Sequence, residues 1–126
     1  KISAMAAEHD REGKSLTLLT VIMAPTDAEA EAKKQGFLDN RDEAAIAEWL
    51  RVSGFDKNRE DYQTLPPEVT TFMSVPFIVG SYQAIADHID ALAENGVAGV
   101  CLSFPDFETD TADFIEHVMP LVKSRQ

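Results

Sequence analysis

Two short segments carry the residues best placed to bind a ligand. The apolar runs Ser15–Met23 and Val97–Phe104 are each followed at once by a turn, Ala24-Pro25 and Pro105-Asp106 respectively. Ligands of parallel α/β folds lie at the carboxyl ends of the strands, on the loops that lead to the next helix. The candidate pocket residues at these two ends are Met23, Ser103, Phe104, Asp106 and Phe107.

Among these residues, Asp106 has the most suggestive carboxylate. Ser103 and Asp106 would offer hydrogen bonds to the polar edge of a substrate, whereas Phe104 and Phe107 would supply an apolar wall. An acidic residue just before a helix is also a common helix cap, in which case both phenylalanines fill the core. The sequence leaves both interpretations of Asp106 open.

Two further groups could contact a ligand. Gly80-Ser81 stands where a helix is expected to begin, so its backbone N–H groups could bind an anion, although a glycine turn with a serine N-cap is the plainer and preferred explanation. Arg59 and Tyr62 lie in residues 55–79, which show no sustained apolar period. We expect that segment to be an irregular insertion and a candidate lid, with a solvated loop as the alternative.

Other reactive groups are few. His9, His88 and His117 fall in expected helices without metal-ligand spacing, so no metal site is expected. The sequence contains no glycine-rich phosphate loop and no GxSxG elbow. Cys101 lies inside an apolar run, and we expect it to be buried and structural rather than a nucleophile. These residues alone define no reaction and no catalytic residue.

The composition and charge exclude some classes of binding partner. The sequence has 22 acidic and 11 basic residues, a formal charge of −11, with 44% hydrophobic residues. Nucleic acids and anionic membrane surfaces require clusters of Lys and Arg, so neither is expected as a partner. No apolar stretch approaches the roughly 18 residues of a membrane-spanning helix. A single cysteine cannot form an internal disulfide, which favours the cytoplasm.

Helices are expected to alternate with the two strands. Thr26 and Glu29 have capping-box spacing and begin an Ala/Glu/Lys-rich helix that runs to about Leu38. Asn95-Gly96 ends the helix that follows Gly80-Ser81. The remaining expected helices cover Ile2 to His9, about Asp42 to Val52, and a last one that is capped by Thr109 or Thr111 and interrupted by Pro120. Strands that alternate with helices pair in parallel through right-handed crossovers.

Two parallel strands, each apolar on both faces, do not make a complete domain. The sequence also opens at Lys1 within a helical pattern, without a capping residue. We therefore expect the chain to be the C-terminal fragment of a larger single α/β domain, with the earlier strands lying before Lys1. The remainder of that domain would then be its first partner.

The stretch Phe77–Phe107 resembles the C-terminal region of bacterial-luciferase-like flavin monooxygenases. Its VGSY entry to a helix, its NGVAGV turn into a strand and its LSFPDF exit carry the resemblance. The sequence VIMAPTDAEAEAKKQ and the late MPLV are similar to the same family, in a branch that includes pyrimidine (uracil) and dimethyl-sulfone monooxygenases.

The resemblance implies the C-terminal part of a (β/α)₈ TIM barrel, with Ser15–Met23 and Val97–Phe104 as strands seven and eight. It also implies a two-component enzyme in which a separate flavin reductase supplies reduced FMN and O₂ is used to oxygenate a small organic substrate. A homo-oligomer is expected, and the fragment alone would be inactive. The alternatives are a non-catalytic flavin-binding subunit of the same fold and a short α/β interaction domain that self-associates.

Overall fold

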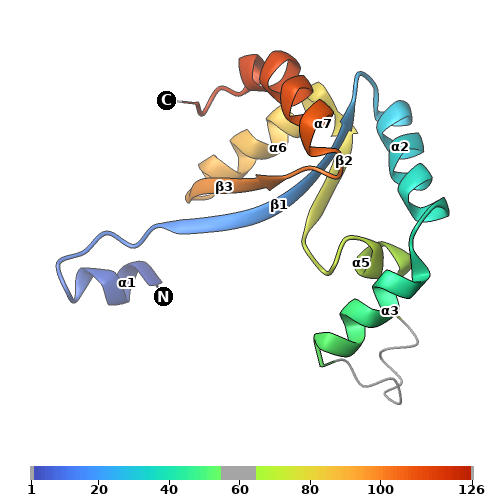
Figure 1. Ribbon diagram of the computed structural model, residues 1–126. Coiled ribbons are helices and arrows are strands. Elements are labelled where there is room, and N and C mark those ends of the chain that lie inside the picture. Colours follow the sequence, from blue (N-terminus) through green and yellow to red (C-terminus); the bar gives the residue numbers. More distant parts are fainter. Residues whose placement is uncertain (1, 55–64, 126) are drawn as a thin grey trace.

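The computed structural model describes residues 2–54 and 65–125 of the 126-residue chain (Figure 1). The strands are β1 (Ser15–Ala24), β2 (Phe77–Ser81) and β3 (Val97–Ser103). The helices are α1 (Ile2–Ala7), α2 (Asp27–Asp39), α3 (Glu43–Val52), α5 (Pro67–Thr71), α6 (Tyr82–Glu94) and α7 (Phe107–Asp113). A π-helical turn (Phe114–Val118) and a 3₁₀ turn (Met119–Leu121) continue α7. No helix in these described ranges is long and apolar enough to cross a membrane.

The three strands form one parallel sheet in the order β2-β1-β3. β2 pairs with the second half of β1, from Thr20↔Phe77 to Ala24↔Ser81. β3 pairs with the first half, from Ser15↔Val97 to Thr20↔Ser103. The prediction of parallel strands is confirmed, but the prediction of only two strands is wrong. The sequence pattern did not predict β2, because its apolar run is short and is bounded by Pro76 and Gly80.

Part of the expected irregular insertion is therefore regular structure. Within residues 55–79, the structure forms α5 and most of β2. Pro67 begins α5, where its missing N–H is not needed, and the fixed φ of proline suits the first turn. Arg59, Tyr62 and the rest of 55–64 lie outside the described residues, so the lid remains a prediction.

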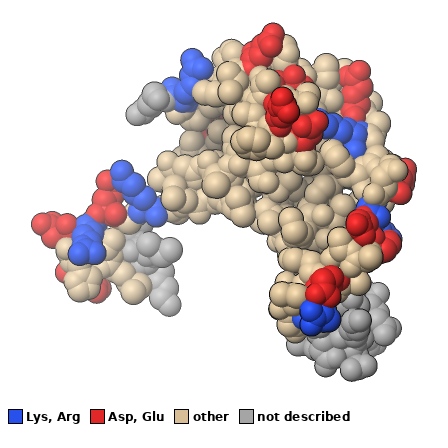
Figure 2. Space-filling view, in the orientation of Figure 1, with Lys and Arg blue, Asp and Glu red and all other residues tan. Residues whose placement is uncertain are grey.

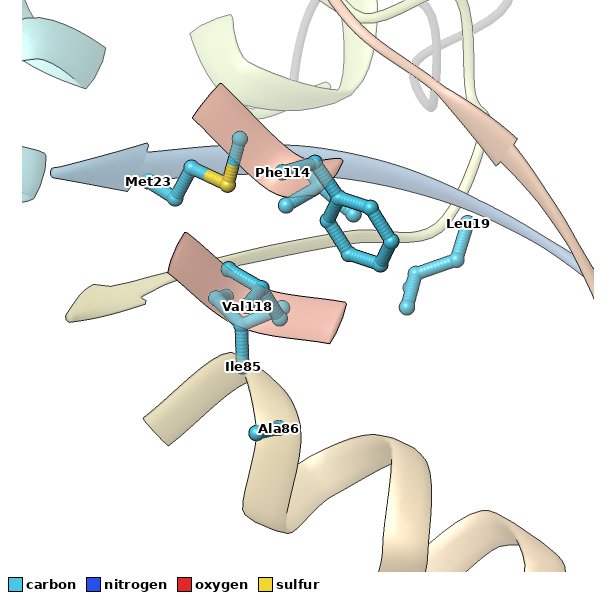
Figure 3. Packing of buried hydrophobic residues seen from close by; sticks show 7 residues of the cluster. Leu19, Met23, Ile85, Ala86, Phe114 and Val118 are labelled. Atoms are coloured by element: carbon cyan, nitrogen blue, oxygen red, sulfur yellow. The ribbon is translucent and has the colours of Figure 1, made fainter. Parts of the chain in front are cut away.

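The core lies between one face of the sheet and helix α6 with the π-helical turn after α7 (Figure 3). Leu19, Val21 and Met23 alternate along β1 and point toward the helices, as period-two strand geometry requires. Ile85, which is fully buried, comes from α6, and Val118, also fully buried, from the π-helical turn. The same cluster contains Ala86 and Phe114.

The opposite face of the sheet is open over its first half. Leu16 is 77% exposed and Leu18 44%, and Cys101, the neighbour of Leu18 in register, is exposed as well. The surface along β1 in Figure 2 is accordingly free of charged side chains over much of its length. The expectation of a buried Cys101 is wrong for this chain. The expectation of strands covered on both faces is confirmed only for the second half of β1, where Ile22 on this face is fully buried and α2 packs against β1 and β2.

Most predicted helix boundaries agree with the structure. The capping box is present: Glu29 N–H donates to Thr26 Oγ1 (3.3 Å) and Thr26 N–H to the Glu29 carboxylate (3.1 Å). The last helix differs, because it begins at Phe107 with Asp106 as its cap, rather than at Thr109 or Thr111. Pro120 does interrupt the regular helix, in the 3₁₀ turn.

Candidate functional site

A pocket of about 430 Å³ lies at the carboxyl end of the sheet, against the open face. Ser103, Phe104 and Pro105 form one side of it as β3 ends. The opposite side comes from the end of α2 and from the turn between α5 and β2. Its volume falls in the range of about 300–1,000 Å³ that is typical of small-molecule sites.

Aromatic rings supply much of the pocket wall. Phe37 of α2 and Phe72 meet edge to face with centroids 6.5 Å apart, and Phe72 continues to Phe77 of β2 at 4.9 Å. Across the pocket, Phe104 packs on Phe114 at 5.5 Å, which ties this wall to the core. Rigid rings on two sides suit a flat, largely apolar ligand.

A few polar groups face the same pocket. Thr71 has a buried hydroxyl that finds no hydrogen-bond partner among the residues the structure describes. Thr20, only 7% exposed, and Ser103 are register partners on adjacent strands. Arg41 is the one basic residue in the described lining, and its guanidinium pairs with Glu43. An unsatisfied buried hydroxyl is unusual and has a natural explanation as a ligand contact.

The turn that carries Phe72 is conformationally unusual. Met73 (φ 52°) and Ser74 (φ 59°) are consecutive non-glycine residues in the left-handed region. Ser74 N–H donates to Val69 O at 2.7 Å, and Val75 N–H to Phe72 O at 3.0 Å, which holds the turn in place. Such residues cost about 1–3 kcal/mol each and concentrate at ligand clamps.

The structure brings together only part of the predicted site. Ser103 and Phe104 line the pocket, but the side chain of Met23 is 1% exposed and lies in the core on the other face. Asp106 accepts a hydrogen bond from Thr109 N–H (3.3 Å) and so acts as a helix cap. Phe107 is 74% exposed. The pocket roles of Met23, Asp106 and Phe107 therefore remain predictions without a contact to the pocket.

Sequence reasoning missed the residues of the opposite wall. Phe37 lies on α2, Thr71 ends α5 and Phe72 is in the turn after it, and their sequence positions carry no strand-end signal. Thr20 could have been noticed, because it is a polar residue within an apolar strand and points to the open face.

At Gly80-Ser81, the carboxylate of Asp27 from the same chain already accepts a backbone hydrogen bond. Ser81 caps α6 by accepting the N–H of Ala84 (3.4 Å), and Ser81 N–H donates to Asp27 Oδ1 (2.6 Å). This backbone hydrogen bond from Ser81, with a second from its side chain, lowers the pKa of Asp27 below 3.8. A Cβ on Gly80 would lie 3.0 Å from Ala84 Cβ, so glycine permits this close approach. Binding of an external anion here remains a prediction.

Tyr82 follows directly and lies in an acidic environment. Its ring stacks on His117 with centroids 4.9 Å apart. Burial, followed by the negative charges of Asp113 and Glu29, raises the pKa of Tyr82 above 10. The tyrosine is thus held in its neutral form, as a packing and hydrogen-bonding group.

The fold and pocket define the class. Parallel strands joined through helices, with a pocket at their carboxyl ends, agree with the predicted C-terminal part of a (β/α)₈ barrel. Two solved structures have the same fold. One is DmoA from Hyphomicrobium sulfonivorans (TM-score 0.73, 22% identity, 94% of this chain and 32% of that chain). The other is riboflavin lyase RcaE with modified FMN and riboflavin (TM-score 0.67, 25% identity, 94% and 33%).

Sequence comparison is more specific. The chain is 36% identical over 134 residues to pyrimidine monooxygenase RutA of Caulobacter vibrioides (strain NA1000 / CB15N), covering 100% of this chain and 37% of that protein. It is also 36% identical over 122 residues to RutA of Acinetobacter baylyi, covering 92% and 33%. No protein-family model matches. The chain spans about a third of the length of these relatives, and its predicted resemblance to a C-terminal portion of luciferase-like flavin monooxygenases is confirmed.

Proposed function

We propose that this chain forms the C-terminal part of a two-component flavin monooxygenase. The whole protein takes reduced FMN from a separate reductase and uses O₂ to oxygenate a small organic substrate that is pyrimidine-like or contains sulfur. It works as a homo-oligomer in the cytoplasm, a compartment in which the free thiol of Cys101 stays reduced. The observation that supports this best is the aromatic pocket at the strand ends of a chain 36% identical to pyrimidine monooxygenase RutA.

The open face of β1 and β3 supports a larger protein. Leu16 and Leu18 expose apolar surface that a closed barrel would bury in its interior. Ser103 and Thr20 continue the same face into the pocket. In this proposal, the remainder of the barrel is the partner that covers the face.

The described pocket residues fit one part of FMN and not another. Phe37, Phe72 and Phe104 offer flat apolar surface for a ring system, and the free Thr71 hydroxyl offers one hydrogen bond. A phosphate group would require cationic or N–H donors, whereas Arg41 is already paired with Glu43. We therefore assign these residues to the wall of the ring and substrate region, and the phosphate contacts to the remainder of the barrel. When bound, reduced FMN supplies the electrons for O₂ activation.

Oxygenation by the whole protein tests the proposal. Chemically reduced FMN replaces the reductase, and uracil and dimethyl sulfone serve as probe substrates. An oxygenated product that depends on both FMN and O₂ supports the enzyme. Flavin binding without product with either probe favours the non-catalytic flavin-binding subunit, and absence of flavin binding favours the self-associating interaction domain.

A substitution links that activity to this pocket. Thr71→Val keeps the shape of the side chain but removes the free hydroxyl, so KM should rise about five- to tenfold if it bonds the substrate. Thr70→Val is the matched control, because the hydroxyl of Thr70 already donates to Pro67 O at 3.0 Å. Equal KM values for both variants would remove Thr71 from the site.

The role of Asp106 needs a separate test. Asn is a comparably good cap but carries no charge, so Asp106→Asn retains the bond to Thr109 N–H. If the carboxylate serves a substrate, turnover falls while stability is nearly unchanged. Unchanged turnover leaves only the capping role.

A further inference from the structure

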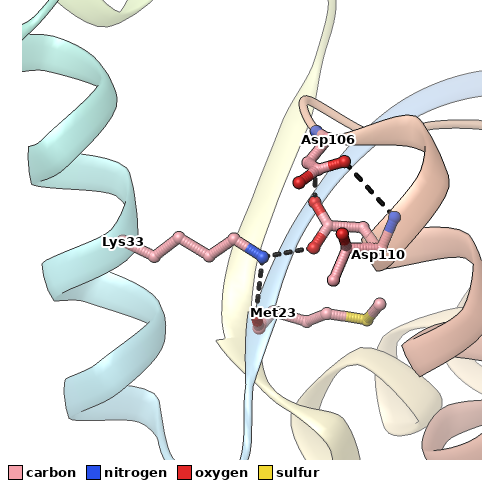
Figure 4. A network of polar contacts seen from close by, with 5 residues as sticks. Met23, Lys33, Asp106 and Asp110 are labelled. Atoms are coloured by element: carbon pink, nitrogen blue, oxygen red, sulfur yellow. Dashed lines mark hydrogen bonds and ion pairs between the residues drawn. The ribbon is translucent and has the colours of Figure 1, made fainter.

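A buried carboxylate lies beside the pocket, and no step described above uses it. Asp110 of α7 is 1% exposed, and its Oδ1 pairs with Lys33 Nζ of α2 (Figure 4). The side chain of Lys33 is 29% exposed. A buried ion pair contributes little net stability, because desolvation offsets the attraction, and apolar replacements are often as stable. Its presence therefore calls for an explanation other than stability.

The geometry of the contacts suggests one. Lys33 Nζ also donates to the carbonyl of Met23 (3.5 Å), near the end of β1. The second oxygen of Asp110 accepts Asp106 N–H (3.3 Å), at the start of α7. One ion pair thus joins the end of β1, helix α2 and the loop that follows β3, as the dashed lines in Figure 4 show.

This loop carries one wall of the pocket. Asp106 comes two residues after Phe104, whose ring lies between the pocket and Phe114 in the core. A shift of Asp106 is transmitted through Pro105, a lining residue with a fixed φ, to Phe104. The position of the wall relative to α2, which supplies Phe37 on the other side, is then set by Lys33 and Asp110.

We propose that Lys33 and Asp110 are positioning residues that hold the β3–α7 loop, and with it Phe104, at the correct distance from the opposite wall. They touch no reacting atom and act through the backbone of Asp106 and Met23. The inference rests on the proposed function only in assigning the pocket to a substrate. The mechanical part, that the ion pair fixes the loop, is independent of what the pocket binds.

The experiment separates positioning from stability in the whole protein. Lys33→Met removes the charge and leaves Asp110 buried and unpaired, so stability should fall as well. The double variant Lys33→Met with Asp110→Leu removes both charges and should recover most of that stability. Lys34→Met is the matched control, since Lys34 pairs with Glu31 on the same helix rather than with Asp110.

Hydrogen exchange at Asp106 N–H gives a readout that needs no activity. We expect exchange at least about tenfold faster in the double variant than in Lys34→Met, even though both unfold at similar urea concentrations, because the amide has lost its acceptor. Slow exchange in the stable double variant would overturn the proposal. The single variant Lys33→Arg retains the charge and leaves Asp110 in place, so exchange at Asp106 N–H should be as slow as in the wild-type protein.

Kinetics then connects the loop to the pocket. A misplaced wall should raise KM about 10- to 100-fold in the double variant with a smaller change in kcat, because a displacement near 1 Å can cost that much. Wild-type KM together with fast exchange would refute the link to the substrate. If the wild-type protein oxygenates neither probe, the proposed function fails, whereas the exchange result still decides the positioning role.

Discussion

The open face of the sheet leads to a prediction about the isolated chain. We expect it to self-associate through the half of the sheet that bears Leu16 and Leu18, and the variant Leu16→Thr/Leu18→Thr tests this. Threonine keeps a high strand propensity, so the sheet itself should be retained. Ile115→Thr is the control, because Ile115 is 57% exposed on the π-helical turn, away from the open face.

The size of the effect follows from the exposures. Leu16 is 77% exposed and Leu18 44%, and full burial of one leucine contributes about 1.5–3 kcal/mol. Covering both therefore contributes about 2–3 kcal/mol per copy, or about 4–6 kcal/mol for a dimer, equal to roughly a 10³- to 10⁴-fold change in the association constant. The double variant should weaken association by about that factor, and Ile115→Thr should leave it unchanged.

Sedimentation over a concentration series measures association, and the thiol of Cys101 provides a second readout. Cys101 lies beside Leu18 in register, so its reaction with a thiol reagent should slow as the chain concentration rises. The slowing should be absent in the double variant. A wild-type chain that stays monomeric at tens of micromolar, with a cooperative melt, would show that the exposed face is tolerated and would refute the prediction.

Three further outcomes are expected. Ile85→Ala should lower stability by about 2–5 kcal/mol, since Ile85 is fully buried in the core cluster, whereas Ile115→Ala should cost less than about 1 kcal/mol in the same urea titration of the whole protein. Thr26→Ala should cost about 1 kcal/mol through loss of the capping box, and Thr26→Ser should recover most of it. The pKa of Asp90 is lowered below 3.8, first by the backbone N–H of Ser124, so its stabilisation is complete above that pH and is lost as pH falls through the folded-state pKa. The urea midpoint of Asp90→Asn should therefore lie below that of wild type at about pH 6 and approach it below about pH 4; a constant difference across that range would contradict the assignment.

The sequence predicted the long elements well, because their signals are local. The capping-box spacing of Thr26 and Glu29 predicts the start of α2. The helical spacing of apolar residues in α6 predicts that Ile85 points into the core. β2 was not predictable in the same way. Its five residues form a strand because Thr20 to Ala24 of β1 offer them an edge, and this pairing depends on a contact some 57 positions away.

The candidate site was predicted only where it follows strand ends. Ser103 and Phe104 were found by the rule that ligands lie at the carboxyl ends of parallel strands. The positions of Phe72 and Thr71 depend on a turn in which Met73 and Ser74 have left-handed backbone conformations. The sequence does not indicate this turn, because neither position is a glycine or an asparagine. Lys33 and Asp110 are ordinary surface residue types in sequence, and only the packing of α2 beside α7 brings them together.

The division of β1 between its two neighbours has a consequence for the wall of the proposed barrel. On the β2 side, the backbone of β1 is already paired from Thr20 to Ala24, and only the stretch from Ser15 to Leu19 remains available. A preceding barrel strand can join β1 on that side only along this lower stretch. Above it, the wall is completed by β2, which arrives through the insertion that also contributes α5.

In the proposed barrel, the lower part of the wall next to β1 is thus formed by a preceding strand, and the upper part, near the pocket, is formed by β2, which follows the insertion. Substitutions or length changes between α3 and β2 would then reshape the entrance while the lower hydrogen-bonded ring stays intact. The pocket entrance and the lower part of the barrel of such an enzyme could therefore diverge separately. New substrates would be accommodated by changes at the entrance while the lower part of the barrel stays the same.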